Sequence, residues 1–249
     1  MHSSSILLTV AAAFLDLTSA HGFVNGIRVN GGTWVPGADP VWYYYTAGTS
    51  PATVGWNSLN QDLGFVSPSA YQTSDIACHK SATAGQLSVS ANAGDTLSIT
   101  WNTWPSDSHK GPIINYIAKC SGSCSSASAS SLTWTKIAEN GYNSGVWATD
   151  GLTSSNYTST LKIPSKLAAG NYVIRHEIIA LHGASSDNGA QNYPQCFNVV
   201  VGGSGTVSVP TGTAGTSLYT RTDPGILFNL YTSFTSYTIP GPALWTGAS

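Results

Sequence analysis

Apolar and polar residues alternate in several short runs along this chain, which is the pattern of half-buried β-strands. Residues 87–91 (Leu-Ser-Val-Ser-Ala) and 96–101 (Thr-Leu-Ser-Ile-Thr-Trp) alternate on either side of a Gly-Asp turn, and together they predict a β-hairpin. No segment keeps a helical period for three turns, although residues 164–170 have room for one helical turn. Other runs rich in β-forming residues lie at 112–118, 132–138, 157–163, 172–181 and 195–201.

Short strands separated by Gly, Ser, Asn and Pro turns indicate an all-β protein with few short helices. The pattern favours an antiparallel β-sandwich of immunoglobulin-like or fibronectin-like type. Residues 25–77 and 202–249 hold few predicted strands, and residues 202–217 are rich in Gly, Ser and Thr. We expect these segments to form long loops over the sandwich, where functional residues usually lie.

The start of the chain has the features of a secretion signal peptide. An apolar run at residues 6–15 is too short to span a bilayer, and Thr18 and Ala20 are the small residues that precede a cleavage site. We therefore expect a signal peptide over residues 1–20 and a secreted, extracellular protein. A slipped cleavage site, which would leave His21 internal or absent, is the alternative.

Cleavage after Ala20 would leave residues 21–249, enough for one β-domain with a full core. We expect this segment to be a single catalytic domain with no appended carbohydrate-binding module. No second apolar stretch could anchor it in a membrane.

Charge is scarce in this sequence. Charged residues make up 8% of the chain, and the formal net charge is −2. This composition excludes binding to nucleic acid or to an anionic membrane through bulk charge. Plentiful Trp, Tyr, Ser, Thr and Gly suit a neutral, hydroxyl-rich partner such as a polysaccharide, although strands and turns alone also favour these residue types.

Four cysteines in an exported chain predict two disulfides, for which three pairings exist. Cys120 and Cys124 can close a small local loop, which leaves Cys78 to reach Cys196. A zinc site with four cysteine ligands is the competing interpretation, but Cys78 and Cys196 each lack a nearby thiol partner in the sequence. The sequon at Asn156 (Asn-Tyr-Thr) predicts N-glycosylation and agrees with export.

Histidines are the most promising catalytic side chains. Glutamates are too few for a hydrolase with paired carboxylates, and the chain has no G-x-S-x-G motif. A histidine at a free amino terminus, as expected for His21, offers both its α-amine and its ring to one metal ion. One further imidazole, such as that of His109, would complete a planar set of three nitrogens, which favours copper over zinc.

Six separated motifs resemble the fungal lytic polysaccharide monooxygenases of auxiliary activity family nine, formerly glycoside hydrolase family sixty-one. The resemblance covers essentially the whole of residues 21–249. The motifs are His-Gly-Phe-Val at 21–24, Asp-Ile-Ala-Cys-His-Lys at 75–80, Ser-His-Lys-Gly-Pro-Ile-Ile-Asn-Tyr at 108–116, Arg-His-Glu-Ile-Ile-Ala-Leu-His at 175–182, Ala-Gln-Asn-Tyr-Pro-Gln-Cys at 190–196 and Thr-Asp-Pro-Gly-Ile-Leu-Phe-Asn-Leu-Tyr at 222–231.

The resemblance implies one copper ion, held by the amine and ring of His21 and by His109, with Tyr193 near the axial position. His182 and Gln191 match the family's pair of polar side chains beside the metal, and such neighbours orient a reactive ligand. In the unprocessed chain, we expect His21 and His109 to lie near each other without completing this copper brace. The resemblance also supports the pairing of Cys78 with Cys196, and His79 and His176 remain structural residues.

The implied reaction is oxidative cleavage of β-1,4-glucan, with cellulose as the expected partner. An external small-molecule or enzyme electron donor reduces copper, which activates dioxygen or hydrogen peroxide, and a ring carbon at the glycosidic bond is hydroxylated. We expect a monomer. Oxidation at the anomeric carbon, at ring carbon four or at both stays open.

Surface tyrosines are expected to stack on the sugar rings of the substrate. Tyr219 lies where the family often carries such a residue, and Tyr44, within the aromatic run at 42–45, is a second candidate. Buried packing is the alternative for both. Departures from the family pattern include Asn115, where an Asp is common, and Lys110.

Three other functions compete with this interpretation. A non-catalytic carbohydrate-binding sandwich has no use for His21 paired with His109. A secreted copper carrier has no use for His182 and Gln191. A hydrolase is disfavoured by the scarcity of carboxylates.

Overall fold

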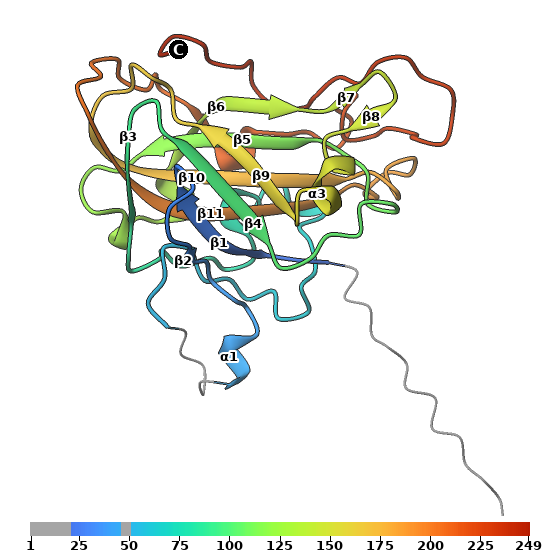
Figure 1. Ribbon diagram of the computed structural model, residues 1–249. Helices are drawn as coiled ribbons and strands as arrows, with labels where there is room; N and C mark the ends of the chain where they lie inside the picture. The colour runs from blue at the N-terminus through green and yellow to red at the C-terminus, as the bar shows by residue number, and fades with distance from the viewer. Residues whose placement is uncertain (1–20, 46–50) are drawn as a thin grey trace, which may run out of the picture.

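The computed structural model describes residues 21–45 and 51–249, and the predicted signal peptide lies outside them. Most of its regular structure is strand, packed as two sheets (Figure 1). The all-β prediction is therefore confirmed. The smaller sheet has four strands in the order β2 (Val35–Pro36), β1 (Val24–Val29), β4 (Thr96–Trp101) and β9 (Thr158–Lys162).

The larger sheet has six strands, and all its pairings are antiparallel except that of β11 with β3. The parallel pair is a local exception in the antiparallel sandwich that the sequence predicted. The strand order is β12 (Thr213–Ala214), β6 (Thr133–Asn140), β5 (Ile113–Lys119), β10 (Gly170–Ala180), β11 (Gln191–Gly202) and β3 (Val89–Asn92).

The remaining elements are short. A two-stranded ribbon joins β7 (Tyr142–Asn143) to β8 (Val146–Trp147). The α-helices of the described residues are α1 (Trp42–Tyr45), α2 (Asp75–Cys78) and α3 (Asp150–Ser154). Single 3-10 turns lie at η1 (Pro68–Ala70), η2 (Cys124–Ser126), η3 (Ala129–Ser131) and η4 (Gly215–Ser217). Across residues 21–45 and 51–249, no helix is long and apolar enough to cross a membrane.

The predicted hairpin of residues 87–101 is wrong, although both strands exist. β3 pairs with β11 in the larger sheet, whereas β4 lies between β1 and β9 in the smaller one. The turn between them is closed by Asp95, whose backbone N–H donates to the Asn92 carbonyl and whose carboxylate accepts from the Asn92 N–H. The turn thus carries the chain from one sheet to the other.

The larger sheet is covered on both faces. One face packs on the smaller sheet through residues such as Ile99, Ile117 and Phe197. The opposite face packs under α2 and the carboxyl-terminal tail through residues such as Ile114 and Leu218. Burial on both faces explains why β5 and β10 are apolar along nearly their whole length. The tail lies over the sandwich as expected, but residues 164–170 form a turn and a bridge rather than a helical turn.

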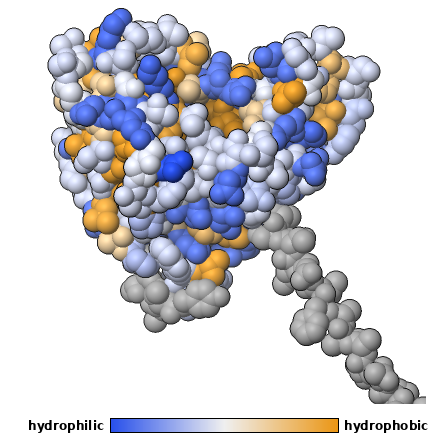
Figure 2. Space-filling model, viewed as in Figure 1, coloured by the Kyte–Doolittle hydropathy of each residue, from blue (hydrophilic) through white to orange (hydrophobic). Residues whose placement is uncertain are grey.

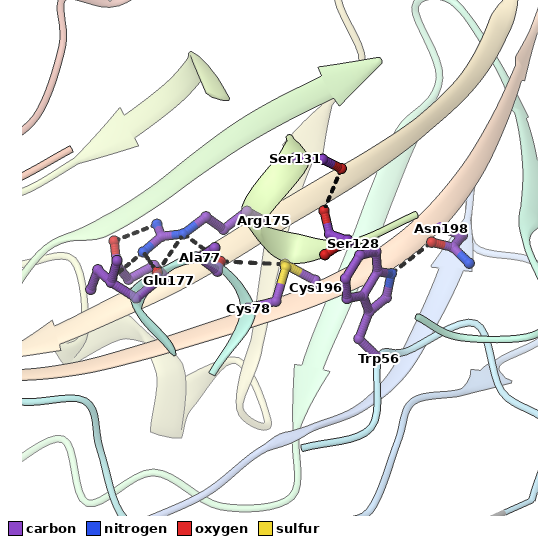
Figure 3. Close-up of a disulfide and its surroundings, with 10 residues drawn as sticks. Trp56, Ala77, Cys78, Ser128, Ser131, Arg175, Glu177, Cys196 and Asn198 are labelled. Carbon is purple, nitrogen blue, oxygen red and sulfur yellow. Dashed lines mark hydrogen bonds and ion pairs between the residues drawn. A yellow bond between two sulfur atoms is a disulfide. The ribbon is translucent and has the colours of Figure 1, made fainter. Parts of the chain in front are cut away.

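Both expected disulfides are present: Cys78 is bonded to Cys196, and Cys120 to Cys124. Figure 3 shows the first beside a fully buried ion pair between Arg175 and Glu177. Arg175 also donates hydrogen bonds to the carbonyls of Ile76 and Ala77 in α2. The disulfide and Arg175 together fix α2 against β10 and β11.

Candidate metal centre

His109 lies at the end of the loop between β4 and β5. The carbonyl of Pro105 accepts the backbone N–H groups of Ser108 and His109, which closes a turn, and the Trp104 indole donates to the His109 carbonyl. The imidazole is 7% exposed. Its Nδ1 is hydrogen-bonded to Ser108 Oγ at 2.9 Å, while its buried Nε2 has no hydrogen-bond partner among the described residues. The ring is therefore held at one nitrogen and open at the other.

His21 directly precedes β1, and the segment after it is fixed to the loop that follows β4. The backbone N–H of Phe23 donates to Asn102 Oδ1, and the Asn102 N–H donates to the Phe23 carbonyl. Gly22 is required by this close approach, because a Cβ there would lie 2.2 Å from the Thr103 carbonyl oxygen. The start of β1 thus lies against the strand end that leads to His109.

The structure brings the predicted site residues together from distant parts of the sequence. The ring centroid of His21 lies 5.4 Å from that of His109 and 5.6 Å from that of Tyr193. His182, after β10, has its ring centroid 4.1 Å from that of His109. Tyr193, on β11, donates its hydroxyl proton to Gln191 Oε1 over 2.8 Å. Three imidazoles, a phenol and an amide therefore form one cluster.

This donor set fits a metal held by two imidazoles and a main-chain amine. In the described part of the chain, no three His, Cys, Asp or Glu side chains are grouped to hold an ion by themselves. The backbone nitrogen of His21 could supply a third ligand, and in the full sequence that nitrogen is an amide. The buried Nε2 of His109 lacks a partner, as a ligand nitrogen would before it binds a metal. The expectation that His21 and His109 lie close together is confirmed.

Burial keeps the histidines of this cluster neutral. Desolvation, followed by the neighbouring rings of His182 and His21, lowers the pKa of His109 to about 4. Desolvation also lowers the pKa of His21 and of His182. Neutral imidazoles are the form that binds metals. Burial raises the pKa of Tyr193, so its phenol stays protonated.

Two aromatic residues that the sequence analysis did not assign, Trp104 and Phe65, complete the cluster. The ring centroid of Trp104 lies 5.1 Å from that of Tyr193 and 5.9 Å from that of His109. The ring of Phe65 lies 6.1 Å from Tyr193 and 6.2 Å from His21. Trp104 could have been found from the sequence, because it precedes His109 by five residues in the same loop. Nothing in the sequence indicates that Phe65 lies near the site.

Asn192 anchors the strand segment that carries Gln191 and Tyr193. Its backbone forms a bridge with Val66, which holds the loop of Phe65 against β11. Its side-chain amide donates to Glu177 and accepts from the Tyr71 hydroxyl. The buried ion pair of Arg175 and Glu177 therefore also supports the cluster from behind.

His79 and His176 are buried and lie outside the cluster, in agreement with a structural role. His176 accepts a hydrogen bond from the Trp101 indole and bonds Asn115 Oδ1. His79 accepts the backbone N–H of Lys80 at Nδ1.

Tyr219 does not belong to a substrate-binding surface, and that prediction is wrong. Its side chain is 2% exposed, and its hydroxyl donates to Glu177 and pairs with the hydroxyl of Tyr116. A ring covered in this way cannot stack on a sugar. Tyr44, on α1, is 67% exposed and remains available at the surface.

Comparisons with known proteins identify the family of this chain. The family model for Auxiliary Activity family 9, formerly GH61, matches residues 21–238. AA9 family lytic polysaccharide monooxygenase F of Malbranchea cinnamomea is 52% identical over 239 residues, covering 94% of this chain and 95% of the relative. The solved structure of Cel61B from Hypocrea jecorina has a TM-score of 0.86 at 49% identity, covering 90% of this chain and all of that one.

A cellulose-active polysaccharide monooxygenase from M. thermophila has a TM-score of 0.76 at 30% identity, covering 91% of this chain and 99% of that one. These relatives share the fold over nearly their whole length. The chain therefore belongs to Auxiliary Activity family 9 and is a metal-dependent lytic polysaccharide monooxygenase, which cleaves polysaccharides by oxidation.

Proposed function

We propose that the mature enzyme begins at His21 and that one copper ion would be held by the His21 amine and ring and the His109 ring, with the phenol of Tyr193 beside them. The unpartnered, buried Nε2 of His109 beside the His21 ring carries this proposal. The family model begins its match at His21, which supports cleavage after Ala20 and secretion. Residues 1–20 are then the signal peptide, and residues 21–249 are the catalytic domain.

Copper held there and reduced by an external electron donor supplies the activation of dioxygen or hydrogen peroxide that ring-carbon hydroxylation requires. The chain's own residues position the reactants. His182 presents a polar ring beside His109, and Gln191 holds the hydroxyl proton of Tyr193. Trp104, His109 and Tyr193 are buried, so the inner side of the site excludes water.

We propose β-1,4-glucan, and cellulose in particular, as the substrate of a monomeric enzyme. The cellulose-active relative from M. thermophila supports this choice. The exposed ring of Tyr44 is the aromatic contact that we assign to the polysaccharide surface.

Copper binding tests the site directly. Mature protein with a terminus confirmed by mass spectrometry should bind one copper(II) tightly in calorimetry and give an axial electron paramagnetic resonance spectrum. His109→Ala and a variant with one extra residue before His21 should both weaken binding, because each removes one of the three nitrogens. A variant with one extra residue after Ser249 is the matched control. Binding that is indifferent to the extra residue before His21 would contradict the proposal.

Product analysis then separates a catalyst from a copper carrier or a carbohydrate-binding sandwich. Copper-loaded enzyme on cellulose with ascorbate should release oxidised oligosaccharides. No such products should form without the reductant.

A further inference from the structure

We infer that a cleft between the two sheets, separate from the metal centre, binds a neutral sugar ring. The cleft has a volume of about 340 Å³, and it lies between β5 and β6 on one side and β9 and α3 on the other. In Figure 1, β5, β6, β9 and α3 lie in the upper half of the molecule. In the same view, Figure 2 shows a hollow at the upper edge of the surface. The volume is at the small end of the roughly 300–1,000 Å³ typical of ligand pockets.

Asn115 supplies an unmatched hydrogen-bond donor to this cleft. Its side chain is 5% exposed and lines the cavity, and its Oδ1 is 2.7 Å from His176 Nδ1. Because the Trp101 indole can only donate, His176 Nε2 must accept and His176 Nδ1 must carry the proton. The oxygen of Asn115 therefore points to His176, and its NH₂ group has no protein partner within the described residues. This NH₂ group is not among the buried side-chain atoms that lack a partner, so it is accessible from the cleft that Asn115 lines. From there it can donate to an acceptor oxygen of a ligand.

The cleft carries no net charge, which indicates a neutral ligand. Among the described residues that line it, Glu139 alone has an ionisable side chain. The Glu139 carboxylate is bonded to Lys136 Nζ at 2.7 Å, and Lys136 in turn donates to the carbonyl of Pro240 in the tail. The strand register places Glu139 opposite Ile114, whose side chain packs on the face away from the smaller sheet. An ion would therefore find no counter-charge in the cleft.

The walls combine apolar and hydroxyl surface, as a pyranose does. Ile113, Ala138 and Leu152 contribute apolar area, and Ser159 contributes a hydroxyl. β9 is an edge strand in the described structure, so alternate backbone N–H and C=O groups along it are free to bind a ligand. A sugar ring can place its C–H face on the apolar side chains and its hydroxyl edge against the Ser159 hydroxyl and the backbone groups of β9.

The neutral sugar ring could come from a glycan attached to this chain or from a soluble glucan. The sequon residue Asn156 is exposed and directly follows Ser155, which lines the cleft. A glycan on Asn156 would be tethered at the rim and so present at high effective concentration. A short soluble glucan is the other source, and the two are distinguished below.

The first experiment uses metal-free mature protein with Asn156→Gln, so that neither copper nor a glycan contributes. Titration with cellotriose should shift the Asn115 side-chain NH₂ resonances saturably in ¹⁵N–¹H spectra. Gly151→Leu should weaken this binding at least tenfold, because Gly151 lines the cleft and has open space around its Cβ position. Gly122→Leu is the matched control, because Gly122 is also unobstructed but lies outside the cleft.

The second experiment compares protein glycosylated at Asn156 with the Asn156→Gln variant. A seated glycan should shift the Asn115 NH₂ resonances before any sugar is added and should weaken cellotriose binding. The inference would be overturned if the Asn115 NH₂ resonances did not shift in either experiment. It would also be overturned if the shift caused by cellotriose persisted in Gly151→Leu. Because no metal is present, neither result depends on the copper proposal.

Discussion

Trp101 and His176 join the two sheets through a hydrogen bond. The indole Nε1 of Trp101, on β4, lies 3.0 Å from Nε2 of His176, on β10. Trp101 also packs its ring at 5.3 Å from that of Trp104, which contacts both Tyr193 and His109. One buried contact between the sheets therefore also supports the candidate metal centre from behind.

Stability should fall in acid because His176 cannot take up a proton while folded. Burial lowers the pKa of His176 from 6.5 to about 3. As the pH falls below about 6.5, the unfolded chain binds a proton that the folded chain refuses, so the free energy of unfolding decreases by about 1.4 kcal/mol per pH unit down to the folded pKa. His79, with its pKa lowered to about 3 by burial, adds a second such contribution.

The variant His176→Gln tests this slope. Denaturant unfolding between about pH 4 and 6 should show a dependence reduced by about one proton, whatever the variant's absolute stability. If the free energy of unfolding depended equally on pH in the original protein and in His176→Gln, the lowered pKa assigned to His176 would be contradicted.

Gln191→Ala should slow catalysis without preventing metal binding. The change removes the acceptor of the Tyr193 hydroxyl but none of the proposed ligands. Loss of such a neighbour typically costs about 10–100-fold in activity. Rates of oxidised-product release and calorimetric copper affinity measure the two effects separately, and Gln72→Ala, at an exposed site, is the control. A variant that loses copper instead would place Gln191 among the ligands.

The two disulfides should contribute unequally to stability. Cys78 and Cys196 are 118 residues apart in sequence, and Cys120 and Cys124 are 4 apart. Loop-closure entropy then gives about 5 kcal/mol for the first and about 2 kcal/mol for the second. Guanidinium unfolding of the paired Cys→Ala variants should show this order, and the reverse order would indicate that the longer loop is already constrained in the unfolded chain.

Tyr219 and Tyr44 should have opposite phenotypes. Tyr219→Phe removes a buried hydroxyl that bonds Glu177, so it should destabilise the fold by about 1–3 kcal/mol and leave cellulose binding unchanged. Tyr44→Ala should weaken cellulose pull-down and change stability by less than about 0.5 kcal/mol, because the ring is exposed. A loss of cellulose binding in well-folded Tyr219→Phe would show that the buried ring acts on the surface after all.

Strands were predictable where side chains alternate or where a strand is buried on both faces. β10 and β11 have such signals, whereas β1 was missed because Asn25 and Gly26 interrupt its short apolar run. The pairing of β3 was not predictable. A tight turn predicts that the chain reverses, but not whether the next strand joins the same sheet or the facing one.

The grouping of His21, His109 and Tyr193 was predictable through local motifs, because each residue stands in a recognisable run. The prediction that Tyr219 binds substrate was wrong because no local motif reveals its burial. Its burial depends on Glu177 and Tyr116, which approach it only through folding across the larger sheet. Phe65 was missed for the same reason, since it reaches the cluster through a loop that Val66 and Asn192 hold in place.

The proposed reaction consumes electrons from an external reductant, and a reductant that carries a thiol can also cleave disulfides. Cys78 is 2% exposed and Cys196 is 5% exposed. Cleavage requires a thiolate to reach a sulfur atom directly, so burial makes this bond kinetically resistant. We therefore expect the covalent link behind Tyr193 to remain intact in the presence of the reductant that the proposed reaction requires.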